Sequence, residues 1–305
     1  MDILLQQLIN GVTLGAVYAL VALGYTMVYG IVGLINFAHG EVVMIGAMVA
    51  FTVITALATH TGLPPGVILL AGLLTAAPAC MALGWALERA AYRPLRHAPR
   101  LTPLITAIGM SIVLQNLAMV VWGRNYINFP QMIDKVGYHF GGAVLTNVQI
   151  AIILISALTM VGLIWLVYRT KLGTAMRATA QDQMVAGLMG VDVDRVISAA
   201  FVIGSALAGL MVGTYYEIAH YQMGFMLGLK AFTAAVLGGI GNLAGAMAGG
   251  VLLGVIEALG AGYIGDLTGG FLGSHYQDIF AFFVLIAVLV FRPSGLFGER
   301  LGERA

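Results

Sequence analysis

Apolar stretches of about twenty residues recur along almost the whole chain, and this repetition limits the fold more than any other feature. A helix needs about 20 apolar residues to cross the hydrocarbon core of a bilayer, whereas strands of a membrane barrel alternate polar and apolar residues. The sequence therefore predicts an all-α integral membrane protein, a polytopic helical bundle of about eight spans. The expected spans are Leu8–Gly30, Glu41–Ala58, Gly66–Leu87, Thr102–Trp122, Thr146–Tyr168, Val196–Tyr216, Leu229–Leu259 and Gln277–Phe291.

The composition supports this class and excludes several others. Charged residues make up only 9% of the 305 positions, whereas a soluble domain carries about 25%. The 41 glycines, with pairs such as Gly11/Gly15 and Gly250/Gly254, favour tight helix–helix packing. A net charge of +1 gives no nucleic-acid footprint, and the single cysteine, Cys80, excludes an internal disulfide. The chain contains no phosphate-binding loop, metalloprotease motif or nucleophile elbow, so we expect neither an enzyme nor a bound cofactor or metal.

The distribution of Lys and Arg predicts the orientation of the chain. Positive residues gather in Glu88–Arg100, in Arg169–Arg195 and in the tail after Phe291. Short loops rich in Lys and Arg stay on the cytoplasmic side, so these segments are assigned there. The segments Gly123–Leu145 and Glu217–Gly228 have little net positive charge and are assigned to the outside.

This orientation requires one interrupted segment late in the chain. Glu217–Gly228 and Gly262–Tyr276 both fall outside, so Leu229–Leu259 must cross an even number of times, yet it is too short for two spans of about 20 residues. Gly238–Asn242 interrupts it in the middle. The sequence predicts a re-entrant helix followed by a longer helix, with backbone that lines a cavity or is buried in protein.

A second interruption is expected near Gly33–Glu41, between two long apolar runs. A straight helix cannot bring Asn36, His39 and Glu41 to one face, but a break at Gly40 would, because glycine adopts backbone angles that other residues avoid. The segment is interpreted as lining a polar cavity or the cytoplasmic mouth of a path. The three side chains line a solute path, position a gate or link helices by hydrogen bonds, and the sequence leaves these roles open.

Three further polar residues are candidates for a translocation path. Ser111 and Gln115 are four residues apart on one expected span, so they share a face and offer hydrogen bonds either to a solute or to another helix. Lys230 opens the second broken element, where it would either meet a solute carboxylate or extend to the outer interface. Glu257, near the end of that element, is expected to reach water.

The cytoplasmic segment Thr170–Val196 carries an apolar pattern that a solvated loop does not need. Met184, Leu188 and Val191 recur at helical spacing beside polar residues, and Gly190 is placed to end the helix. The sequence therefore predicts a short amphipathic helix. Its apolar face packs either on the membrane domain or in the groove of a partner, and periodicity does not decide between them.

These motifs, taken together, resemble the LivH family, the inner-membrane permease subunits of branched-chain amino-acid ABC importers. The resemblance covers nearly the whole chain in order, although the outer loop Arg124–Asn147 matches least. It rests on Asn10–Leu20, Gly24–Gly30, Leu34–Glu41, Ala107–Ser111, Arg177–Asp182, Asp194–Arg195, Phe201–Gly204, Lys230–Gly241 and Arg292–Gly298.

The resemblance implies one transmembrane permease domain over residues 1–305 in a bacterial inner membrane. Its partners would be a second, homologous permease, two cytoplasmic ATP-binding subunits and a periplasmic binding protein that delivers leucine, isoleucine or valine. It assigns the loop 170–196 to docking on an ATPase, through Gln181, Asp182, Met184, Gly187, Leu188 and Gly190. Related permeases for urea or short amides share much of the pattern. A different class, a stand-alone secondary transporter or channel that handles ions through His39, Glu41 and Glu257, is the other hypothesis.

Overall fold

The structure, a computed structural model, describes residues 2–96, 98–99, 101–130, 132, 134–140, 142–210, 218–267, 277–292 and 294–298. Some expected features lie outside the described residues: Arg100, Tyr216, Glu217, much of the loop Gly262–Tyr276 and the tail beyond residue 298.

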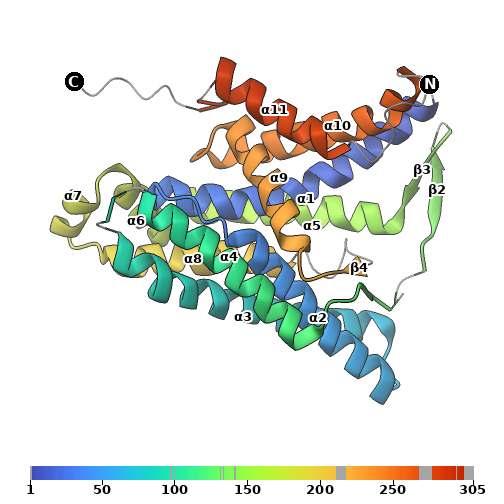
Figure 1. Cartoon of the computed structure of the whole chain (residues 1–305), viewed down its shortest axis with the longest axis horizontal. Helices are drawn as coiled ribbons and strands as arrows, with labels where there is room; N and C mark the ends of the chain where they lie inside the picture. The colour runs from blue at the N-terminus through green and yellow to red at the C-terminus, as the bar shows by residue number, and fades with distance from the viewer. Residues whose placement is uncertain are drawn as a thin grey trace. The chain divides into compact units, whose positions relative to one another are not determined.

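Helices make up most of the described chain (Figure 1). Six of them are long and apolar enough to cross a membrane, and α9 and most of α11 are shorter apolar helices. The prediction of an all-α, polytopic membrane fold is confirmed. The helices are α1 (Asp2–Val32), α2 (His39–His60), α3 (Pro65–Leu87), η1 (Glu88–Tyr92, a π-helix), η2 (Arg93–Leu95, a 3₁₀ turn), α4 (Leu101–Trp122), α5 (Asn147–Arg169), α6 (Lys171–Gln181), α7 (Gln183–Leu188), α8 (Val193–Leu210), α9 (Met223–Gly238), α10 (Leu243–Leu267) and α11 (Gln277–Phe291).

Short strands, which the sequence analysis did not predict, lie in the loops expected outside. Strand β2 (Gly137–Phe140) pairs with β3 (Ala143–Thr146) in an antiparallel hairpin. Strand β1 (Ile127–Asn128) pairs antiparallel with β4 (Ile218–Ala219). The second pair joins two loops that the charge pattern assigned to one side, so their contact agrees with the predicted orientation.

The chain forms two compact units. The first comprises Met1–Thr26, Lys135–Met160 and Lys230–Ala305, and the second comprises Met27–Asp134 and Val161–Leu229. Three of the four boundaries fall inside α1, α5 and α9, so these helices contribute to both units, and the fourth lies between β1 and β2. The expectation of a single domain stays a prediction.

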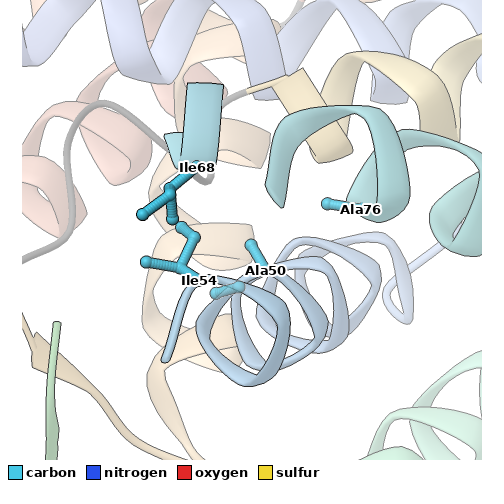
Figure 2. Close-up of a cluster of buried hydrophobic side chains, with 5 residues drawn as sticks. Ala50, Ile54, Ile68 and Ala76 are labelled. Carbon is cyan, nitrogen blue, oxygen red and sulfur yellow. The ribbon is translucent and has the colours of Figure 1, made fainter. Parts of the chain in front are cut away.

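In the second unit, α2, α3 and α8 pack on one another, and α4 packs on α2. Figure 2 shows Ile54 of α2 meeting Ile68 of α3, with Ala50 and Ala76 nearby; all four are buried. The small residues bring the helix backbones close. A Cβ at Gly84 would collide with the side chain of Ser205, so only glycine fits there. Association of helices in lipid depends on this kind of close packing.

In the first unit, α1 and α10 meet through glycines, as the paired spacing predicted. A Cβ at Gly11 would lie 2.7 Å from Cα of Val255, and one at Gly15 would lie 2.6 Å from Cα of Val251. Real Cβ atoms do not approach backbone so closely, so the contact requires hydrogen at both positions.

Both predicted interruptions are present, but one is displaced. Helix α1 ends at Val32, Gly33 takes a φ of 69°, and α2 begins at His39. The break therefore precedes Gly40, and the prediction of a break at Gly40 is wrong. Gly40 lies inside α2, where a Cβ would collide with the carbonyl of Gly224, so close packing explains this glycine.

The later interruption lies where it was predicted. Helix α9 ends at Gly238 and α10 begins at Leu243, with φ angles of 105° at Gly239 and 97° at Gly241. The C-terminal segment satisfies the end of α9, because the amides of Leu296 and Phe297 donate to the carbonyls of Leu237 and Gly238 at 2.9 and 3.0 Å. Buried helix ends need such partners.

Candidate translocation site and coupling loop

Glu41 lies in the first turn of α2 and is fully buried. Its Oε1 accepts hydrogen bonds from Oγ of Ser111 at 2.9 Å and from Nε2 of Gln115 at 2.8 Å. The two donors share one face of α4, as their spacing predicted, and bond to each other at 3.2 Å. The structure thus brings three of the six predicted path residues together around one carboxyl group.

Asn36 and Glu41 make contacts with different helices. Oδ1 of Asn36 accepts a hydrogen bond from the hydroxyl of Tyr92, in η1, at 2.7 Å. The carbonyl of Asn36 accepts from the amide of His39, whose side chain is buried. The break between α1 and α2 is therefore attached to η1 and to α4 separately. Tyr92 was not among the predicted site residues, because an aromatic residue beside several arginines is typical of a membrane interface.

The first turn of α9 packs directly on the start of α2. A Cβ at Gly40 would lie 2.8 Å from Cα of Gly228, and one at Gly224 would lie 2.9 Å from Cα of Glu41. The two helix starts meet backbone to backbone, without side chains between them. No spacing in the sequence signalled that these glycines, far apart in the chain, face each other.

Lys230 does not occupy the position that the sequence suggested. Helix α9 begins at Met223, so Lys230 lies in its middle, is buried, and forms ion pairs with Oε1 of Glu257 at 2.5 Å and Oδ1 of Asp278 at 2.6 Å. The hydroxyl of Tyr18 donates to Oε2 of Glu257 at 2.6 Å and accepts from Nζ of Lys230 at 3.2 Å. The expectations that Lys230 extends to the outer interface and that Glu257 reaches water are wrong, because these buried charges compensate each other.

The segment 170–196, which the charge pattern assigned to the cytoplasm, folds into two helices instead of one. Oδ1 of Asp182 accepts from the amides of Met184 and Val185 at 2.8 and 3.0 Å, so Asp182 ends α6 and caps α7. Gly190, at a φ of 85°, ends α7 as predicted. The amide of Val191 donates to the carbonyl of Ala186, which completes a Schellman motif.

The apolar face of α7 stays exposed on this chain. Met184, Leu188 and Met189 are 78%, 82% and 80% exposed. At the start of the same helix, Nε2 of Gln183 donates to the carbonyl of Ile31 at 3.3 Å, in the last turn of α1. The loop therefore presents an apolar face outward and is bonded at its base to the segment that precedes the first break.

A network of charges, which the sequence analysis missed, connects the two loops assigned to the cytoplasm. Asp194 pairs with Arg93 and Arg96, and Arg96 also pairs with Glu88. The buried carboxylate of Glu88 accepts from Oγ of Ser198 at 2.7 Å. The sequence contained a signal for this network, because opposite charges occur in two loops that the charge pattern assigned to the same side of the membrane. Burial raises the pKa of Asp194, but the hydrogen bonds and charges of Arg93 and Arg96 lower it more, so the pKa lies below its ordinary value.

Multiple apolar helices, two helix breaks and an exposed loop helix define a polytopic membrane protein, and the family that it matches makes it a transport component and not an enzyme. Residues 7–289 match the family described as "Branched-chain amino acid transport system / permease component". The chain belongs to this family.

Curated relatives cover nearly the full length of the chain. It is 46% identical over 303 residues to the "High-affinity branched-chain amino acid transport system permease protein LivH" of Escherichia coli (strain K12), covering 97% of this chain and 96% of the relative. The corresponding protein BraD of Pseudomonas aeruginosa shows the same identity and coverage. A probable LivH of Methanocaldococcus jannaschii is 26% identical over 283 residues, 92% of this chain and 88% of the relative.

Proposed function

We propose that this chain is the permease subunit of an ABC importer that moves leucine, isoleucine or valine across a bacterial inner membrane. A periplasmic binding protein delivers the amino acid, a second homologous permease completes the path, and two cytoplasmic subunits hydrolyse ATP. The near full-length identity to permeases named for high-affinity branched-chain amino acid transport carries this proposal.

In this proposal the loop 170–196 transmits movement from the ATPases. The exposed face of Met184, Leu188 and Met189 gives an apolar contact for a partner groove. The bond from Gln183 to Ile31 supports transmission of that movement to the break between α1 and α2. Gln181, Asp182, Gly187 and Gly190 shape the loop around this face, since Asp182 caps α7 and Gly190 ends it.

The proposed path uses Asn36, His39, Glu41, Ser111, Gln115 and Lys230. Glu41 and its two donors on α4 form a polar site among apolar helices, which supports a role in the path. Lys230 fits less well, because two carboxylates already neutralise it.

The substrate assignment is tested by uptake into proteoliposomes that contain the whole importer and its binding protein. We expect ATP-dependent accumulation of leucine, isoleucine and valine, and little uptake of urea or acetamide. Uptake by this chain alone, driven by an ion gradient, would instead support the stand-alone transporter.

The coupling role is tested with Met184→Glu and Gly187→Glu. A charge on the exposed face should weaken docking of the ATPases, so co-purification of these subunits should fall at least ~10-fold while membrane insertion stays normal. Arg124→Glu, in a loop assigned to the other side, is the matched control. Normal co-purification and uptake in both variants would overturn the assignment.

A further inference from the structure

One oxygen of the buried Glu41 carboxyl group accepts no hydrogen bond from the residues that the structure describes. Oε1 accepts two hydrogen bonds, whereas Oε2 is buried without a hydrogen bond from any described residue. Both partners of Oε1, Ser111 and Gln115, are neutral donors, and the described residues give Glu41 no cation. The carboxyl group therefore has an acceptor oxygen to which the described residues supply neither a hydrogen bond nor a cation.

The depth of this carboxyl group makes the lack of a cation expensive. Ser111 lies near the middle of α4, a 22-residue helix about 33 Å long, so about 16 Å of helix extends on either side of it. The carboxyl group of Glu41, at the start of the apolar helix α2, therefore lies against the middle of the apolar helix α4. An ionisable side chain at this depth is costly, and in membrane proteins it usually marks a pathway for solutes or ions.

The free oxygen faces a surface made of backbone. A Cβ at Gly224, in the first turn of α9, would collide with Oε2 of Glu41. Gly224 and Gly228 also touch Gly40 of α2 without intervening side chains. Two helices that meet through glycines can separate without pulling interlocked side chains apart. The N-terminal end of α9 also carries a partial positive charge, which in the closed state faces the carboxyl group.

We propose that Glu41 binds the α-ammonium group of the transported amino acid when the first turn of α9 moves away from α2. Ser111 and Gln115 hold Oε1, so that Oε2 points at the incoming cation. An ammonium group supplies both the positive charge and the donor hydrogens that Oε2 lacks. When the solute leaves, the start of α9 closes over the carboxyl group again. This inference rests on the proposed function, because it requires a solute with an ammonium group.

The test compares Glu41→Gln with Glu41→Asp in the whole importer, reconstituted with its binding protein and supplied with L-leucine. Glutamine keeps the shape and the acceptor oxygen but loses the charge, whereas aspartate keeps the charge on a shorter chain. We expect Glu41→Gln to lower maximal uptake at least ~10-fold, with an unchanged apparent KM for the loaded binding protein, and Glu41→Asp to retain more uptake than Glu41→Gln. A merely structural carboxyl group would give the reverse order. Asn116→Ala, which removes an exposed amide bonded within α4, is the control.

A labelling experiment tests access without relying on uptake. In a Cys80→Ala background, Glu41→Cys should react with 2-aminoethyl methanethiosulfonate, an ammonium-bearing thiol reagent, during ATP turnover, and at least ~3-fold more slowly without ATP. Absence of labelling in every state would overturn the proposal. If the wild-type importer fails to accumulate L-leucine, the proposed function fails. If it succeeds and Glu41→Gln matches Asn116→Ala, only the present inference fails.

Discussion

Two of the buried glutamates, Glu41 and Glu257, have very different surroundings. Glu257 contacts Lys230 and Tyr18, and Asp278 completes the cluster, so each charge there has an opposite charge within hydrogen-bonding distance. Glu41 has only the neutral donors Ser111 and Gln115, and its second oxygen is left without a hydrogen bond from the described residues.

The difference separates a structural cluster from a candidate binding site. Removing one member of a compensated ion pair leaves an uncompensated buried charge, so the cluster around Glu257 should be essential for folding. The carboxyl group of Glu41 is uncompensated already, so its charge should matter for transport and little for folding. Each glutamate also lies near a glycine contact between helices. Glu257 is on α10, which meets α1 through glycines, and Glu41 lies beside the contact between Gly40 and Gly224.

The largest expected effect is the loss of folding stability in the variant Lys230→Met. This change leaves Glu257 and Asp278 without their cation, and we expect it to lower the free energy of unfolding by about 3–5 kcal/mol. Thermal unfolding can be followed through the single cysteine, Cys80, which is buried and reacts with a thiol dye when the protein opens. The double variant Lys230→Met/Glu257→Met should recover part of the loss. Unchanged stability in Lys230→Met would remove the distinction between the two glutamates.

The second effect concerns the glycine contact in the first unit. Gly15→Ala places a methyl group where a Cβ would lie 2.6 Å from Cα of Val251, and overpacking of this kind costs about 1–3 kcal/mol. The same dye assay should show a lower unfolding temperature. Gly66→Ala, which meets open space at the start of α3, serves as the control and should unfold at or above the wild-type temperature.

A smaller effect is expected for the exposed charge network, which is a useful reference for the buried one. The pKa of Asp194 is depressed in the folded protein, so its stabilising contribution is present above the ordinary aspartate pKa and is lost as the pH falls through the lowered value. Because the side chain is 50% exposed, the contribution should stay below about 1 kcal/mol. Unfolding temperatures of wild type and Asp194→Asn should differ at pH 7 and converge in acid.

The smallest expected effect is the stability change of Glu41→Gln. The amide keeps the acceptor for Ser111 and Gln115 and removes a carboxyl group to which the described residues give no cation, so the free energy of unfolding should not fall. The thiol dye assay measures it beside Glu257→Gln, which should be clearly destabilised. Equal losses in the two variants would show that both glutamates are structural.

Local patterns predicted the features that depend on nearby residues. The spacing of Ser111 and Gln115 predicted that they share a face of one helix, and Gly190 predicted where the loop helix ends. Both features depend only on residues within about one helical turn. The glycine-rich stretch Gly238–Asn242 was identified as a break for the same reason. The break that was expected at Gly40 lies at Gly33 instead. Glycine is selected both where a chain turns and where two helices touch closely, so the sequence did not show which of the two glycines marks the break.

The sequence by itself determined that this chain is a polytopic membrane protein, that it has one break before and one break after the middle of the chain, and to which family it belongs. Apolar length, glycine and positive charge act locally, so they can be read along the chain. The tertiary structure decided which buried charges are compensated. Tyr18 meets Lys230 and Glu257 across 212 and 239 positions of sequence, and no periodicity extends that far. Only the packing of the helices shows that Glu257 has a cation and that the described residues give Glu41 none.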